Sequence, residues 1–160
     1  MNGGILPLLL MGATLGLALS LLDPRAALAC VAAWAAAALL LSFVPIPAVG
    51  GQIAFAGLWL SVIATAALLY LPATLSPRWM VAVAANGGAW AGAVVALGEP
   101  RLGLIPAIML CLLFIPGRWA AEHGLAIGTK IVASWMIAIA SLSLFVSQMP
   151  TPGYVKDHME

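Results

Sequence analysis

The sequence contains few charged residues for a chain of 160. Lys, Arg, Asp and Glu make up only 7% of it, whereas apolar residues make up 64% and the mean hydropathy is +1.15. In a water-soluble domain of this size about a quarter of the residues are charged, because the surface of the domain faces water. The composition therefore excludes a soluble domain. It predicts an all-α integral membrane protein whose surface contacts the lipid bilayer.

Other absences narrow the function further. The net charge is +1, with no basic run, so nucleic acid is not an expected partner. The two cysteines, Cys30 and Cys111, lie in apolar runs and form no CxxC pair. No Walker loop, nucleophile elbow or zinc pair is present. We therefore expect no metal, no cofactor and no enzymatic activity. The acids Asp23, Glu99 and Glu122 lie at segment ends, which argues against proton antiport because proton-coupled carriers place a carboxylate inside the bundle.

Six apolar segments approach the roughly 20 residues that a membrane helix needs. They are Ile5–Leu22, Ala26–Val44, Gln52–Leu71, Trp79–Leu97, Leu102–Ile115 and Leu125–Val146. The fifth is short and contains Pro106, so it either crosses with little tilt or runs on through Trp119 to the interface. A signal peptide has Lys or Arg before its apolar region, and no Lys or Arg precedes the first segment. We therefore expect this segment to remain as a membrane helix.

The basic residues indicate an orientation. With six spans, one side of the membrane receives four of them: Arg25, Arg78, Arg118 and Lys130. The other side receives Arg101 and Lys156. Because cytoplasmic loops are enriched in Lys and Arg, both termini are predicted outside, which is the periplasm for a bacterial inner-membrane protein. Cysteine labelling from each side of the membrane can check this.

The sequence resembles itself at an offset of 76 residues. The matching pairs are Gly12-Ala13 with Gly88-Ala89, Gly16 with Gly92, Asp23-Pro24-Arg25 with Glu99-Pro100-Arg101, and Trp59 with Trp135. We interpret residues 1–160 as one domain made of two repeats, 1–76 and 77–150, followed by a short polar tail, 151–160. Three spans per repeat would make the repeats inverted, as in many transporters. The alternative is chance similarity in a chain rich in Ala and Leu.

The acid-Pro-Arg turns allow two interpretations. Asp23 and Glu99 favour helix N-termini, and Arg25 and Arg101 can reach the lipid headgroups. Alternatively, these residues form ion pairs that gate the two faces of the protein.

Small residues recur at every fourth position in four stripes. The stripes are Gly12/Gly16/Ser20, Gly57/Ser61/Thr65, Ala84/Gly88/Gly92/Ala96 and Gly124/Gly128. Such stripes let helix backbones approach closely in lipid, so we expect Gly88 and Gly92 at a helix–helix contact. Dimerisation is the alternative use of a stripe.

Five residues are candidates for binding a ligand, each with a structural alternative. Trp59 and Trp135 lie near the middle of their spans and either fill space or line a pocket. Asn86, followed by two glycines, either bonds a neighbouring helix or contacts a substrate where the helix opens. Gln52 ends a Pro- and Gly-rich segment that is a loop or a re-entrant bend. Lys130 either reaches back to the headgroups or faces a cavity.

The stretch from Phe114 to Lys130 contains three of the few charged residues, which are Arg118, Glu122 and Lys130. Gly117 is expected to break the helix there, with Arg118 and Trp119 at the interface. The leading hypothesis for the whole chain is a small transporter or channel for a small solute. The alternative is a non-catalytic accessory subunit of a larger membrane complex, and either could be a homodimer.

Overall fold

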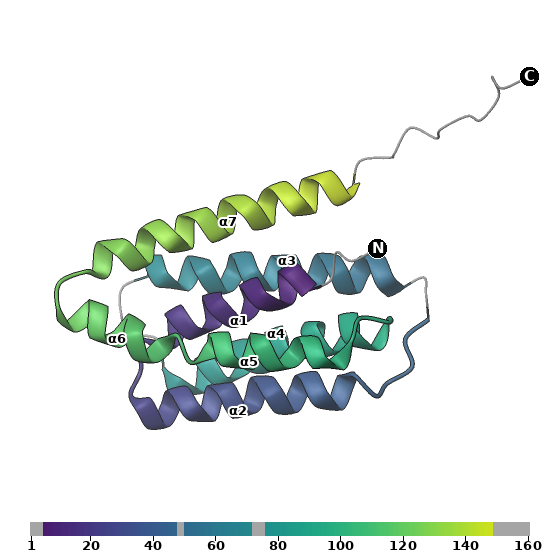
Figure 1. Cartoon of the computed structure of the whole chain (residues 1–160), viewed down its shortest axis with the longest axis horizontal. Coiled ribbons are helices and arrows are strands. Elements are labelled where there is room, and N and C mark those ends of the chain that lie inside the picture. Colours follow the sequence, from purple (N-terminus) through teal and green to yellow (C-terminus); the bar gives the residue numbers. More distant parts are fainter. Residues whose placement is uncertain (1–4, 48–49, 72–75, 149–160) are drawn as a thin grey trace, which may run out of the picture.

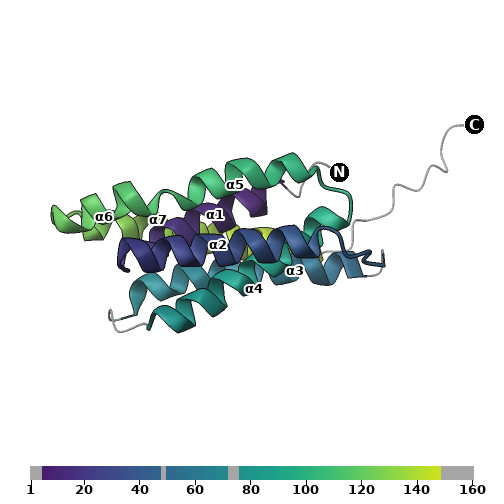
Figure 2. The ribbon, with the colours of Figure 1, turned by 90° about the horizontal axis from the view of Figure 1, so that it is seen from below.

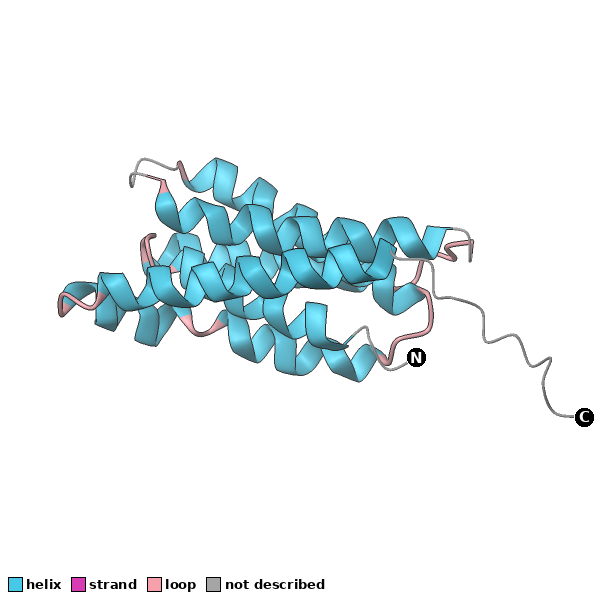
Figure 3. Ribbon diagram, turned by 90° about the horizontal axis from the view of Figure 1, so that it is seen from above, coloured by secondary structure: helices cyan, strands magenta, loops and turns pink. Residues whose placement is uncertain are grey.

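The structure is a computed structural model that describes residues 5–47, 50–71 and 76–148, and this part of the chain contains helices and no strand (Figure 3). The α-helices are α1 (Ile5–Leu19), α2 (Pro24–Leu41), α3 (Gly51–Ala67), α4 (Pro77–Ala96), α5 (Leu104–Cys111), α6 (Phe114–Glu122) and α7 (Ala126–Gln148). Two short 3-10 helices, η2 (Leu68–Tyr70) and η3 (Arg101–Gly103), extend α3 and precede α5. The all-helical prediction is confirmed for these residues. The predicted tail 151–160 lies outside them.

Among the residues that the structure describes, five helical stretches are long and apolar enough to cross a membrane. They are Pro24–Leu41, Gly51–Tyr70, Pro77–Ala96, Arg101–Glu122 and Ile127–Ser147. Helix α1 has 15 residues and is therefore about 22 Å long, which is shorter than the roughly 30 Å hydrocarbon layer. Five candidate spans therefore support the membrane class, and the predicted sixth span is not confirmed.

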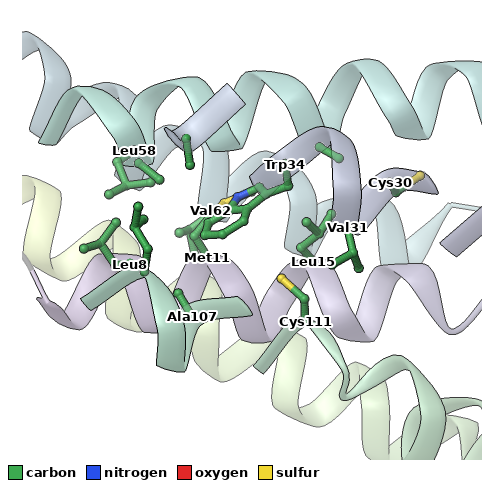
Figure 4. Packing of buried hydrophobic residues seen from close by; sticks show 14 of the residues in the cluster. Leu8, Met11, Leu15, Cys30, Val31, Trp34, Leu58, Val62, Ala107 and Cys111 are labelled. Carbon is green, nitrogen blue, oxygen red and sulfur yellow. The ribbon is translucent and has the colours of Figure 1, made fainter. Parts of the chain in front are cut away.

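The helices lie side by side along the long axis of the molecule, with α1 in the interior (Figures 1 and 2). Helix α1 packs mainly on α5 and α3, whereas α2 and α4 make the most extensive contact of any pair. Four large side chains of α1 are fully buried: Leu8, Met11, Leu15 and Leu19. Leu8, Met11 and Leu15 lie near Trp34 of α2 and Val62 of α3 in the central core (Figure 4), and Leu19 belongs to the same cluster. Helix α1 begins and α7 ends at the same end of the bundle (Figure 1).

The fifth span runs on through Trp119, which is the second of the two predicted alternatives, and extends to Glu122. It is interrupted at Leu112 and Leu113, between α5 and α6. Pro116 explains this position, because proline cannot donate to the carbonyl four residues earlier and its ring clashes with it. The Leu112 carbonyl instead accepts a hydrogen bond from the N–H of Ile115, at 3.0 Å.

The prediction that Gly117 breaks the helix is wrong. This residue lies within α6, where it packs closely on the side chain of Ser20. The helix stops instead at Gly124, whose φ of +76° favours glycine. The N–H of Leu125 donates to the Ala120 carbonyl and that of Gly124 to the Ala121 carbonyl, which together form a Schellman motif. This motif allows α6 and α7 to be joined by a very short turn.

Two helices start at a proline. Pro24 follows the N-cap residue Asp23, which the sequence predicts at a helix N-terminus, and Pro77 follows the N-cap residue Ser76, which was not predicted. Neither cap residue makes a side-chain hydrogen bond to the helix. At the second acid-Pro-Arg turn the residue preceding the helix is Pro100, and Arg101 begins η3. The helical segment therefore begins one residue later in the second acid-Pro-Arg motif than in the first.

The glycine stripes bring helices into backbone contact, as predicted. A Cβ atom added at Gly88 or Gly92 would meet the carbonyl oxygen of Trp34 or Ala38 in α2. The stripe of α1 faces α5 in the same way, since Gly12 meets the carbonyl of Ala107. The fourth stripe does not behave like the others. Nothing lies within 4 Å of such an atom at Gly124 or Gly128.

Helix α7 lies on the outside of the bundle and packs chiefly on α3 (Figure 1). The small residues Ala133 and Ala140 of α7 are buried, whereas most of its large apolar side chains are exposed. In a membrane protein such a face is solvated by lipid, so its exposure is not by itself an interaction site.

Candidate functional site

Asn86 occupies the middle of α4 and is exposed on the surface of the bundle. Its Nδ2 donates a hydrogen bond of 3.1 Å to Oγ of Ser61 in α3. Helix α4 continues without interruption through the two glycines that follow, Gly87 and Gly88, so the helix is not opened at this point. Of the two interpretations of Asn86, the helix-to-helix hydrogen bond is the one that the structure contains.

The α3 stripe supplies the rest of this polar site. Ser61 and Thr65 are buried one turn apart, and Gly57, one turn earlier, packs beneath the ring of Trp90 from α4. The Thr65 hydroxyl is buried without a hydrogen-bond partner among the described residues. Small side chains on α3 thus let α4 approach closely enough for Asn86 to reach Ser61. We call Asn86, Ser61 and Thr65 the α3–α4 polar site.

The tryptophans are placed in very different environments. Trp34 and Trp59 are buried in the core, with 0% and 1% exposure. Their indole N–H groups have no hydrogen-bond partner in the part of the chain that the structure describes. Trp135, which the repeat pairs with Trp59, is 70% exposed on α7. The two residues therefore do not line a common space.

Lys130 lies near the start of α7, about 6 Å along the axis from its first residue. Its side chain is exposed, and its backbone carbonyl accepts a hydrogen bond of 2.6 Å from the hydroxyl of Tyr70. A lysine stem can span this distance to the headgroups. Its position on the surface fits snorkelling.

The charged stretch around Arg118 forms a structural junction. Arg118 Nε donates to Glu122 at 2.9 Å, and its Nη1 donates to the Leu22 carbonyl beyond the end of α1 at 3.2 Å. The rings of Trp119 and His123 stack with centroids 4.4 Å apart. Arg118 thereby ties α6 to the connection between α1 and α2.

The predicted gate residues lie at opposite ends of the bundle. Asp23 and Arg25 are exposed where α2 begins, whereas Glu99 and Arg101 precede α5 at the other end (Figure 1). Gln52 is exposed in the first turn of α3 and is helical rather than part of a bend. The structure does not gather the predicted binding residues into one cavity, and their ligand-binding roles stay predictions.

A groove that the sequence did not predict runs between α2 and α5. It has a volume of about 310 Å³ and an almost wholly apolar lining that includes Leu39, Leu104, Ile105 and Ile108. Arg101 lines one end, with its guanidinium carbon 4.4 Å from the ring centre of Phe43. The only sequence signal was the placement of Arg101 on the less basic side. The groove depends on how far α2 and α5 diverge, which is a tertiary property.

Within residues 5–47, 50–71 and 76–148, no three His, Cys, Asp or Glu side chains come together in a metal-binding group. Comparison of the chain with protein-family models, with curated proteins and with solved structures found no match. The function must therefore be inferred from the α3–α4 polar site and its surroundings.

Proposed function

We propose that the protein is a non-catalytic accessory subunit that packs against a partner membrane protein through the α3–α4 polar site. The observation behind this proposal is the exposed amide of Asn86 at the middle of a span. Surface residues at that depth in a membrane helix are normally apolar, because lipid offers no hydrogen bonds.

The chemistry of the amide favours a protein partner over lipid. An Asn side chain has two N–H donors and a carbonyl acceptor, and the bond to Ser61 uses one donor. A hydrocarbon chain cannot satisfy the remaining capacity, whereas a polar side chain on a neighbouring helix can. The apolar surroundings of Asn86 on α4 would then pack against that helix.

The placement of the other candidate residues supports this function over solute transport. Trp59 is buried, and Trp135 and Lys130 are exposed on α7, on the outer side of the bundle. A transport path would require such residues to face a shared polar space. Their dispersal favours a subunit whose interior serves packing.

Asn86→Leu is expected to weaken association with the partner while the fold is preserved. Interhelical hydrogen bonds contribute about 0.6 kcal/mol on average and about 1.7 kcal/mol at most, so the association constant should fall about 3-fold to 20-fold. Photo-crosslinking from a probe next to position 86 in native membranes, with native-gel mobility, would measure the loss.

Two variants serve as controls for this substitution. Asn86→Gln keeps the amide and should retain part of the association. Gln52→Leu removes an exposed amide at the end of a span, where water can satisfy it, and should have no effect. A protein that remains a single chain in native membranes, with or without Asn86, would refute the proposal.

Transport of a small solute is the second candidate, and one observation favours it. Gly12 faces the carbonyl of Ala107 in α5, and Gly16 faces those of Leu110 and Cys111, three and four residues further along. Gly88 and Gly92 face those of Trp34 and Ala38 in α2, which are four residues apart. In an inverted repeat with α1 as a sixth span, α4 would correspond to α1 and α5 to α2. The packing of α4 on α2 would then correspond to the packing of α1 on α5. Such a repeat would also place both termini on one side of the membrane, which the basic residues predict to be the outside of an inner membrane.

Lys130→Met distinguishes the two candidates. Because Lys130 is exposed and within reach of the headgroups, we expect this variant to behave like the wild type in proteoliposome uptake of anionic solutes. Loss of an uptake activity that the wild type possesses, with an unchanged melting temperature, would favour the transporter.

A further inference from the structure

We propose that the groove between α2 and α5 binds an anionic phospholipid, with its phosphate on Arg101 and an acyl chain along the groove. The groove is charged at one end and apolar along the rest of its length. This distribution of charge complements an amphipathic anion and differs from the flat apolar surface that most of a membrane helix presents to bulk lipid.

The depth of each group in the membrane fits a phospholipid. Arg101 is the first residue of the span Arg101–Glu122, so it lies at the level of the headgroups. The lining continues to Ile108, seven residues further, which is about 10 Å toward the centre of the bilayer. Phe43 lies at the end of α2 beside Arg101, and Leu39 lies one turn deeper, so α2 and α5 follow the same gradient from surface to core.

Arg101 is held in a geometry suited to phosphate. Its guanidinium carbon lies over the ring of Phe43, 4.4 Å from the ring centre, in a cation–π contact. The N–H donors of a guanidinium lie at its edge, and their fork matches two phosphate oxygens. The contact with Phe43 therefore holds the guanidinium at the end of the groove before a lipid arrives.

The apolar part of the groove accepts a chain rather than a helix. Its volume of about 310 Å³ is at the lower end of the range for small-molecule sites and far below the volume of a helix. Leu39 and Ile105 stand at its opening, each 54% exposed, whereas the lining residues Trp34, Ala38 and Leu104 are buried. A buried apolar floor between two exposed apolar side chains makes a channel for one extended chain.

Lipid retention tests this proposal directly. The full-length protein is purified from nanodiscs containing equal amounts of phosphatidylglycerol and phosphatidylcholine with identical chains, and bound lipid is measured by native mass spectrometry. The wild type should retain phosphatidylglycerol preferentially. Arg101→Gln should reduce that preference about fivefold, as expected for one basic residue near an anionic headgroup.

Matched variants separate the site from general surface attraction. Arg25→Gln and Arg78→Gln remove exposed arginines that do not line the groove and should leave retention unchanged. Ile105→Trp should fill the groove and lower retention of both lipids, with Arg101 intact. Equal retention by wild type and Arg101→Gln, or an equal loss in Arg78→Gln, would overturn the proposal. A partner helix copurifying in place of lipid and lost with Ile105→Trp would also overturn it.

Discussion

Replacing Gly88 or Gly92 by alanine is expected to lower the stability of the protein sharply, even though alanine is the better helix former. An added Cβ at these positions would meet backbone carbonyl oxygens of Trp34 and Ala38 in α2, which cannot rotate away as a side chain can. The helices would have to separate along the most extensive contact in the bundle. Overpacking of this kind costs about 1–3 kcal/mol, and the loss of packing along α2 and α4 adds to it.

Gly128→Ala is the matched control. Gly128 is also a glycine within a membrane helix, but nothing lies within 4 Å of the position that its Cβ would take. Alanine is favoured over glycine in a helix by about 1 kcal/mol, so this variant should be as stable as the wild type or slightly more stable. Unfolding in a denaturing detergent gives the free energies. Equal stability of Gly88→Ala and Gly128→Ala would contradict the observed packing.

These two glycines also show what the sequence could predict about packing. Spacing of small residues by four is a local property of a helix, so the stripes of α1 and α4 were correctly expected to contact other helices. The helix that each stripe meets depends on the tertiary arrangement and was not predictable. Gly124 and Gly128 have the same spacing, yet one ends α6 and the other faces open space.

The interruption of the fifth span between α5 and α6 could have been predicted from the sequence. The sequence interpretation placed the break at Gly117, where a glycine suggests flexibility. The rule that proline disrupts the carbonyl four residues earlier would have placed it at Leu112. The groove and the cation–π pair of Arg101 with Phe43 had no such local signal, because they depend on two segments more than 50 residues apart in the sequence.

The predicted binding residues failed to converge for a related physical reason. Periodicity and position within a span do not say whether a side chain points inward, because membrane helices are apolar on all sides. Burial depends on how many neighbours a helix has. Helix α3 has α1, α4 and α7 around it, whereas α7 packs chiefly on α3. Residues at matching positions of the two halves can therefore lie in opposite environments.

Trp59 and Trp135 provide the sharpest test of that asymmetry. Trp59 is 1% exposed among core side chains, so Trp59→Ala would leave a cavity that neither lipid nor neighbouring residues fill. Truncation of a buried tryptophan costs about 3–5 kcal/mol in water-soluble proteins. In lipid the lost van der Waals contacts and the cavity remain as costs, and we expect about 3 kcal/mol.

Trp135→Ala should change the free energy of unfolding very little in the isolated protein, because lipid or detergent surrounds that side chain already. The same detergent titration measures both variants, with no change in helix content as the check on the fold. Similar losses for the two residues in the purified single chain would contradict the exposed position of α7. A loss for Trp135→Ala that appears only in native membranes would instead mean that a partner helix covers α7, which would move the docking face of the subunit from Asn86 to the opposite side of α3.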